Sequence, residues 1–173
     1  MARNLHERQA PLKETYESEP EAAQVTLTAT GDEAADATAC SVEVVETVYE
    51  AGHHEGAGGS GTAACAGDLL LGALAACSQL TAQAVIENSG VDATVSVRVE
   101  GDLDLRGTMG VADVPVGFQD IRLDATLSGD LDPETAAAIQ EATEGYCVVY
   151  RTLVDTPDAT TEWTFEKSAE DEI

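Results

Sequence analysis

One stretch of the chain is apolar on every side. Residues 69–86, LLLGALAACSQLTAQAVI, contain no charged side chain, and Asp68 before them and Ser89-Gly90 after them are helix start and stop signals. Apolar residues recur on every face of a helix built from this stretch, which is typical of a buried helix. We therefore expect a long central helix that the rest of the protein surrounds.

Alternating apolar and polar residues predict strands on both sides of this helix. The expected strands lie at 25–29, 41–49, 94–105 and 121–127, and a last one is marked by Trp163 and Phe165. Residues 31–38 form an acidic turn, and two Gly-rich segments, 52–62 and 106–117, are expected to be loops.

Three shorter helices complete the pattern. Residues 1–20 form an amino-terminal arm with a helix that has Pro11 at its start and Pro20 past its end. Asp132-Pro133 opens a second helix that ends near residue 145, and Cys147 begins a third.

This order of elements predicts an α+β fold with mostly antiparallel sheets, in a single domain over 1–173 with a solvated acidic tail at 167–173. One small sheet cannot cover a helix that is apolar all round, so we expect a homodimer.

The charge indicates where the protein works rather than what it does. The chain has 33 acidic and 8 basic residues and a net charge of -25, which repels itself unless concentrated salt screens it. We interpret the surface as halophilic, as in salt-rich archaeal cytosol. Nucleic acid and anionic membranes are excluded as partners because no basic patch is available.

The first residues lack an apolar run, and Gln, Ser and Thr within 69–86 argue against a membrane span, so we expect a cytoplasmic protein.

Four cysteines are the candidates for chemistry: Cys40, Cys65, Cys77 and Cys147. In a reducing cytosol they are not expected to form structural disulfides. Cys77 lies in the middle of the central helix, where the helix dipole has little effect, so a nearby cation or base would have to activate it. Cys147 starts a helix, where backbone N–H groups favour a thiolate. Each could equally be inert packing, and their spacing alone does not bring them together.

The two cysteine-containing segments resemble a known signature. LLLGALAACSQLT and YCVVYRTL are similar to the two motifs of the OsmC/Ohr family of thiol-dependent hydroperoxide reductases, in the same order. The resemblance implies an intertwined homodimer with antiparallel sheets wrapped around a central helix. It implies that Cys77 is the peroxidatic thiol and Cys147 the resolving thiol, that the substrate is an organic hydroperoxide in an apolar site lined by Leu70 and Leu74, and that a dithiol reductant reopens the disulfide. No metal or organic cofactor is implied.

The sequence departs from this family at one point. Members with established peroxidase activity carry a Glu in the first helical turn, paired with an Arg that contacts the reactive Cys. Here that position aligns with Gly67, and Asp68 lies roughly 13 Å along a helix from Cys77. Arg106 and, from a swapped amino-terminal arm, Arg8 are the candidate partners, and surface charge pairing is the alternative for each.

Other residues are weaker candidates. His53, next to His54 in the Gly-rich loop, could act as a base or be an exposed loop residue. Cys65 could be an additional thiol, although it lies about 18 Å along the helix from Cys77. Cys40 is expected to pack in a strand, and no metal-ligand spacing is present. Two other functions remain open: an apolar-ligand-binding dimer without turnover, and a thiol redox sensor.

Overall fold

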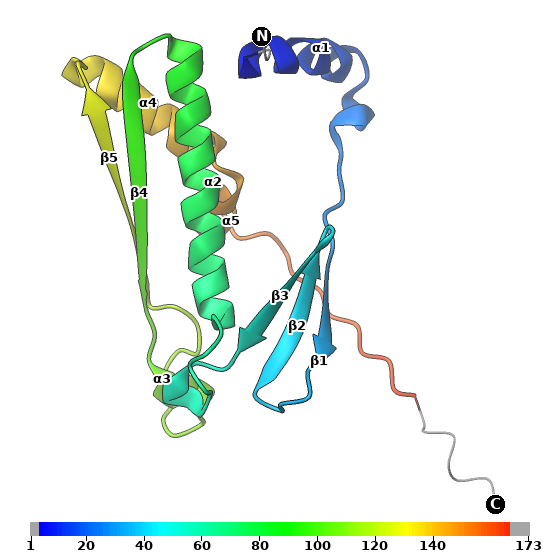
Figure 1. The fold of residues 1–173 in the computed structure, drawn as a ribbon. Coiled ribbons are helices and arrows are strands. Elements are labelled where there is room, and N and C mark those ends of the chain that lie inside the picture. The colour runs from blue at the N-terminus through cyan, green and yellow to red at the C-terminus, as the bar shows by residue number, and fades with distance from the viewer. Residues whose placement is uncertain (1–3, 167–173) are drawn as a thin grey trace, which may run out of the picture.

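The long helix is the axis of the structure, a computed structural model that describes residues 4–166; the expected acidic tail at 167–173 lies outside them. Helix α2 runs from Ala66 to Ser89, three residues longer at each end than the apolar stretch. A stripe of residues at spacing four is buried along it: Leu74, Ser78, Ala82 and Ile86. The α+β fold with antiparallel sheets and a long central helix is confirmed (Figure 1).

A two-stranded antiparallel sheet packs against one side of α2 (Figure 1). Strand β4 spans Ala93–Asp102 and β5 spans Asp120–Gly129, with Val97 opposite Ala125. The side-chain amide of Gln79 on α2 donates to the carbonyl of Val95 at 2.9 Å, which ties the helix to the sheet.

The expected strand at 94–105 is too long. Leu105 begins the short helix α3, Leu105–Thr108, because the side chain of Asp104 accepts a hydrogen bond from the Arg106 N–H at 3.0 Å and caps that helix.

The amino-terminal strands form a separate antiparallel sheet in the order β1-β2-β3. They span Ala29–Glu33, Ala39–Val44 and Thr47–Gly52. The single strand expected at 41–49 is wrong, because the chain reverses at Val45, whose φ of 58° lies in the left-handed region. The strand expected at 25–29 begins only at Ala29, so the acidic turn is confined to the residues after Glu33.

This three-stranded sheet stands apart from α2 in Figure 1 and joins it through little contact. A parallel bridge pairs Ala51 with Ala64, and the Gly52 N–H donates to the Ala64 carbonyl at 3.0 Å. The Gly-rich segment that follows β3 is a loop with one 3₁₀ turn, η2, at Glu55–Ala57. Within one chain, the β1-β2-β3 sheet therefore covers little of α2, which packs against β4, α4 and α5 instead.

The arm at the amino terminus is helical, but the helix begins earlier than expected. Helix α1 spans Leu5–Ser18 because Asn4 caps it, and Pro11 lies inside the helix rather than at its start. The 3₁₀ turn η1, Pro20–Ala23, follows it. The N–H of Leu5 donates to the carboxylate of Glu87 at 3.0 Å, so α1 attaches to the carboxy-terminal end of α2.

Two consecutive helices pack on another side of α2. Helix α4 spans Pro133–Tyr146, and α5 spans Val148–Val154, with Cys147 at the junction. The side chain of Asp132 caps α4 by accepting hydrogen bonds from two backbone N–H groups at 2.9 Å. Both helices were predicted, the first from the Asp-Pro start signal and the second as a segment beginning at Cys147.

The expected last strand does not form within residues 4–166. The side chains of Trp163 and Phe165 are 80% and 90% exposed, and the segment has no regular secondary structure. A strand needs a partner edge for its backbone groups, and within the described chain this segment has none.

One face of α2 also remains exposed in the single chain. It carries no charge until Glu87 and is built from Leu69, Gly72, Ala73, Ala76, Leu80 and Gln83. By length and composition α2 could span a membrane. Its buried stripe packs against β4, α4 and α5, as a core helix of a soluble domain does.

Candidate functional site

The two cysteines of the sequence signature lie side by side. Cys77 is on the face of α2 that meets the start of α5, and its thiol interacts with the thiol of Cys147. Cys77 is partly exposed, whereas Cys147 is 1% exposed. The packing of α5 on α2 thus brings together two sulfur atoms that are far apart in the sequence.

Among residues 4–166, backbone amides rather than cationic side chains act on the pKa of the Cys77 thiol. Burial raises the pKa of Cys77, but the N–H of Val149, the Cys147 thiol, the N–H of Val148 and the Thr81 hydroxyl together lower that pKa below its usual value. Val148 and Val149 are the first two residues of α5, so their N–H groups have no acceptor within the helix. The first turn of α5 therefore favours the thiolate of Cys77.

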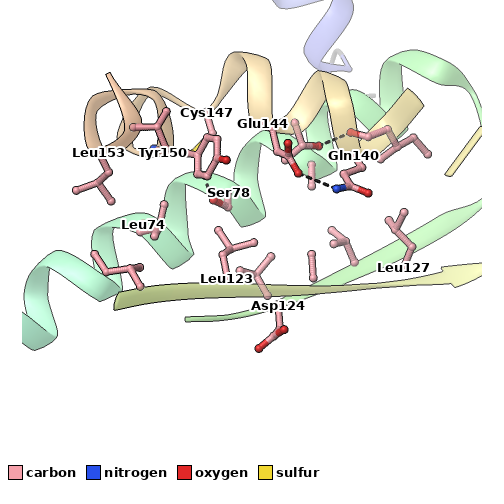
Figure 2. Close-up of a pocket in the computed structure, with 18 of the residues that line it drawn as sticks. Leu74, Ser78, Leu123, Asp124, Leu127, Gln140, Glu144, Cys147, Tyr150 and Leu153 are labelled. Carbon is pink, nitrogen blue, oxygen red and sulfur yellow. Dashed lines mark hydrogen bonds between the residues drawn. The ribbon is translucent and has the colours of Figure 1, made fainter. Parts of the chain in front are cut away.

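The third N–H of that turn is directed at the second sulfur. The Tyr150 N–H donates to Sγ of Cys147 at 3.5 Å, and the hydroxyl of Ser78 lies 3.3 Å from the same sulfur (Figure 2). Cys147 is thus the N-cap of α5 through its side chain. The three free N–H groups at the start of this helix are shared between two thiols.

An apolar cavity of about 1310 Å³ borders one of the two thiols. It lies between the β4–β5 sheet and helices α2, α4 and α5, as Figure 2 shows. Cys147 and Ser78 are part of its wall, and Cys77 is not. The lining includes both leucines expected for an apolar site, with leucines of β5 and α5: Leu70, Leu74, Leu123, Leu127 and Leu153.

The predicted cation partners of Cys77 lie elsewhere in the chain. Arg106 binds Asp104 through its Nε at 2.9 Å, and Arg8 belongs to α1, which attaches to the far end of α2. His53 follows β3, where its N–H donates to the Thr38 carbonyl at 2.8 Å. None of these three side chains contributes to the pKa of Cys77.

Asp68 and Cys65 cap the start of α2. The Asp68 carboxylate accepts a hydrogen bond from the Cys65 N–H at 2.9 Å, and this bond lowers the pKa of Asp68. The helix is continuous from Ala66, so Cys65 is about 18 Å from Cys77 along its axis. Cys40 lies in β2, as expected. Within residues 4–166, no three His, Cys, Asp or Glu side chains are grouped to hold a metal ion.

The sequence analysis missed three contributors to the site: the α5 amides, Thr81 and Ser78. A signal for Thr81 was available, because it follows Cys77 by four residues and so shares its helix face. Ser78 is the polar member of an otherwise apolar stripe at spacing four, and this pattern could have identified it as a site residue. The amides of Val148 and Val149 leave no mark on side-chain patterns, because every residue except proline carries the same N–H.

Comparison with known proteins identifies the fold. The family model for OsmC-like proteins matches residues 59–162. No curated protein matches the sequence. An OsmC-like protein from Mycoplasma pneumoniae has a similar structure, with a TM-score of 0.64, 15% identity, and coverage of 77% of this chain and 90% of that one.

The structures of two organic hydroperoxide resistance proteins are also similar. The protein from Elizabethkingia anophelis gives a TM-score of 0.55 at 20% identity, covering 75% of this chain and 89% of its own. The protein from Legionella pneumophila gives 0.55 at 19% identity, covering 76% and 90%. At these identities the likeness concerns the fold.

Proposed function

Because the chain belongs to the family of OsmC-like proteins, we propose that it reduces organic hydroperoxides, with Cys77 as the attacking thiolate and Cys147 as the resolving thiol. The observation that carries the proposal is the proximity of the two thiols where α5 packs on α2: the Cys147 thiol helps to lower the pKa of Cys77, which is partly exposed. A peroxide-stress or other redox function agrees with the family and with the names of structurally similar proteins.

The first step oxidises Cys77. Its thiolate attacks the outer oxygen of the O–O bond, the bond breaks, and the alkoxide leaves as an alcohol after taking a proton. Cys77 is now a sulfenic acid. Within one chain, the amides of Val148 and Val149 and the Thr81 hydroxyl stabilise the thiolate without an arginine.

The second step closes a disulfide. The sulfur of Cys147 attacks the sulfur of Cys77, an S–S bond forms, the S–O bond breaks, and hydroxide leaves and becomes water. A dithiol reductant then reopens the disulfide by exchange and is itself oxidised to a disulfide. The residues supply the whole chemistry, without a metal or organic cofactor.

The substrate preference follows from the apolar surroundings. Leu74 and Leu70 lie on α2 one and two turns before Cys77 and line the apolar cavity, which borders the neighbouring Cys147. An organic group would bury apolar area there, while hydrogen peroxide has none to bury. We therefore assign organic hydroperoxides as the substrate class.

The active form is a homodimer, in which each chain is a single domain over residues 1–173. The uncharged outer face of α2 has small residues at Gly72, Ala73 and Ala76, which let a second helix approach closely. The carboxy-terminal segment with Trp163 and Phe165 lacks a strand partner within the described chain and would find one on the copy. The net charge of -25 supports a salt-rich cytoplasm as the location of this dimer.

Turnover of cumene hydroperoxide with a dithiol donor, in buffer containing molar KCl, tests the proposal. The wild type should consume the peroxide and prefer it to hydrogen peroxide, and Cys77→Ser should abolish consumption. Cys147→Ser should accumulate a sulfenic acid on Cys77 that a dimedone probe traps. Absence of both turnover and sulfenic acid in the wild type would overturn the proposal.

A second function is favoured by the cavity, which borders Cys147 rather than Cys77. In that case the protein binds a small apolar ligand and does not turn over peroxide, or forms the Cys77–Cys147 disulfide once as a redox signal. A binder would protect Cys147 from alkylation when an apolar ligand such as a fatty acid is added. A sensor would form the disulfide stoichiometrically and recycle slowly.

A further inference from the structure

Ser78 is the one polar side chain that is fully buried among residues 4–166. It is 2% exposed and sits in the buried stripe of α2, where the other members are Leu74, Ala82 and Ile86. Alanine at that position would fill the stripe without burying a hydroxyl, and a buried hydroxyl is costly unless it is hydrogen-bonded. The presence of serine here therefore calls for a partner.

The partner is the sulfur of Cys147. The Ser78 Oγ lies 3.3 Å from Sγ of Cys147. This contact is the one hydrogen bond that the Ser78 side chain makes within the described chain. On its other side the same sulfur accepts the Tyr150 N–H at 3.5 Å. Figure 2 shows Ser78 directed from α2 toward Cys147 at the junction of α4 and α5.

The direction of this hydrogen bond depends on the state of the sulfur. When Cys147 is a thiol, either group can donate to the other. When Cys147 is a thiolate, the sulfur has no proton, and only the hydroxyl can donate. A hydrogen bond to a charged acceptor is stronger than one between neutral groups, so the Ser78 hydroxyl can hold the sulfur in place in the form that attacks.

We propose that Ser78 is a positioning residue that prepares Cys147 to attack Cys77. The inference rests on the proposed function, in which Cys147 resolves the oxidised Cys77. Two polar groups, the Ser78 hydroxyl and the Tyr150 N–H, hold a nearly fully buried sulfur from two sides and fix its position for the attack. Ser78 is adjacent to Cys77 in α2, so the same helix carries both the sulfur to be attacked and the hydroxyl that prepares its attacker.

The test isolates the attack of Cys147 from the reduction of peroxide. In full-length protein with Cys40→Ser and Cys65→Ser, the aromatic disulfide DTNB forms a mixed disulfide on the accessible Cys77 and releases one thionitrobenzoate. Cys147 then attacks the Cys77 sulfur, an S–S bond to Cys147 forms, and the bond to the second thionitrobenzoate breaks. The rate of this second release, followed at its visible absorbance, measures the attack directly.

Three variants give the expected pattern. Ser78→Ala should slow the second release about tenfold, the effect of losing one hydrogen bond to a charged group. Ser78→Thr keeps the hydroxyl, and its added methyl group can extend into the adjoining cavity, so it should restore the rate to near that of the wild type. Ser89→Ala, which removes a hydroxyl bound to the Ile86 carbonyl of the same helix, should leave the rate unchanged.

The outcomes separate this inference from the proposed function. An unchanged second release in Ser78→Ala, or an equal slowing in Ser78→Ala and Ser78→Thr, would overturn the role of the hydroxyl. If the wild type fails to consume cumene hydroperoxide while Ser78→Ala still slows the second release and Ser78→Thr restores it, the proposed peroxidase function fails and the role of Ser78 stands. The first release reports on Cys77 and should be the same in all four proteins.

Discussion

The carboxylate of Asp68 accepts a hydrogen bond from the backbone N–H of Cys65, 2.9 Å away across the first turn of α2. This is half of a capping box, in which the third helical residue binds back to the N-cap. Asp68 is the acidic residue nearest to the position where peroxidase members of the family carry Glu. Its carboxylate is used to cap the start of α2. The Cys77 thiolate is stabilised by the start of α5 instead.

Replacing the capping carboxylate should affect stability and leave the thiol unchanged. Asp68→Ala removes the acceptor of the Cys65 N–H, so the free energy of unfolding should fall by about 1 kcal/mol, measured by urea denaturation in molar KCl. The rate of Cys77 alkylation in the folded protein should equal that of the wild type. A large fall in alkylation rate without a loss of stability would instead assign Asp68 to the thiol.

Removing one amide donor should raise the pKa of Cys77. Val148→Pro deletes the N–H at the first position of α5, where proline fits because Cys147 before it is already extended. Val148→Ala is the matched control, because it keeps the N–H and changes only an exposed side chain. The pH dependence of iodoacetamide alkylation at Cys77 gives the pKa. Equal values in the two variants would contradict activation by this amide.

The Thr81 hydroxyl should act in the same direction. It follows Cys77 by one helical turn and contributes to lowering the pKa of that thiol. Thr81→Val keeps the shape and loses the hydroxyl, so it should raise the pKa of Cys77, while Thr81→Ser should leave it low. The same alkylation profile measures both, and a low pKa in Thr81→Val would remove the hydroxyl from the mechanism.

The sequence predicted those parts of the fold whose signals are local. The charge-free stretch gave α2, alternation gave β4 and β5, and the Asp132-Pro133 pair gave the start of α4. The β2–β3 reversal was missed because Val45 has a left-handed φ without the Gly or Asn that usually marks such a turn. Trp163 and Phe165 have the pattern of a strand, but a strand also needs a pairing edge.

The sequence identified the two cysteines of the candidate site but could not show how they are arranged in space. Both cysteines were named because their segments resemble a family signature, whereas their contact depends on how α5 packs against α2. The activating group was sought among side chains, at Arg106, Arg8, His53 and Asp68. Within residues 4–166 of one chain, the groups that lower the pKa of Cys77 include backbone amides, which have no partner in the helix because α5 begins there.

The loss of folding stability at low pH should depend on the ion pair between Arg106 and Asp104 at α3. The Arg106 guanidinium and the Arg106 N–H lower the pKa of Asp104 to about 2. A carboxyl whose pKa is lower in the folded protein adds stability above its unfolded value, near 4, and loses that contribution as the pH falls toward 2. Asp104→Asn keeps a capping side chain without the charge, so its stability should fall less steeply between pH 4 and 2. Identical slopes in urea titrations would contradict this.

The exposed face of α2 should control association. Leu80 is 66% exposed in the single chain, at the centre of the uncharged face that we assign to the dimer. Leu80→Glu would bury a charge against the second helix, so sedimentation in molar KCl should show dimers for the wild type and monomers for the variant. Trp163, the one tryptophan of the chain, should emit at longer wavelength in the monomer, because its strand loses its partner edge. Val111→Glu, on an exposed loop, is the matched control and should stay dimeric. A wild type that sediments as a monomer at micromolar concentration would refute the assignment of this face.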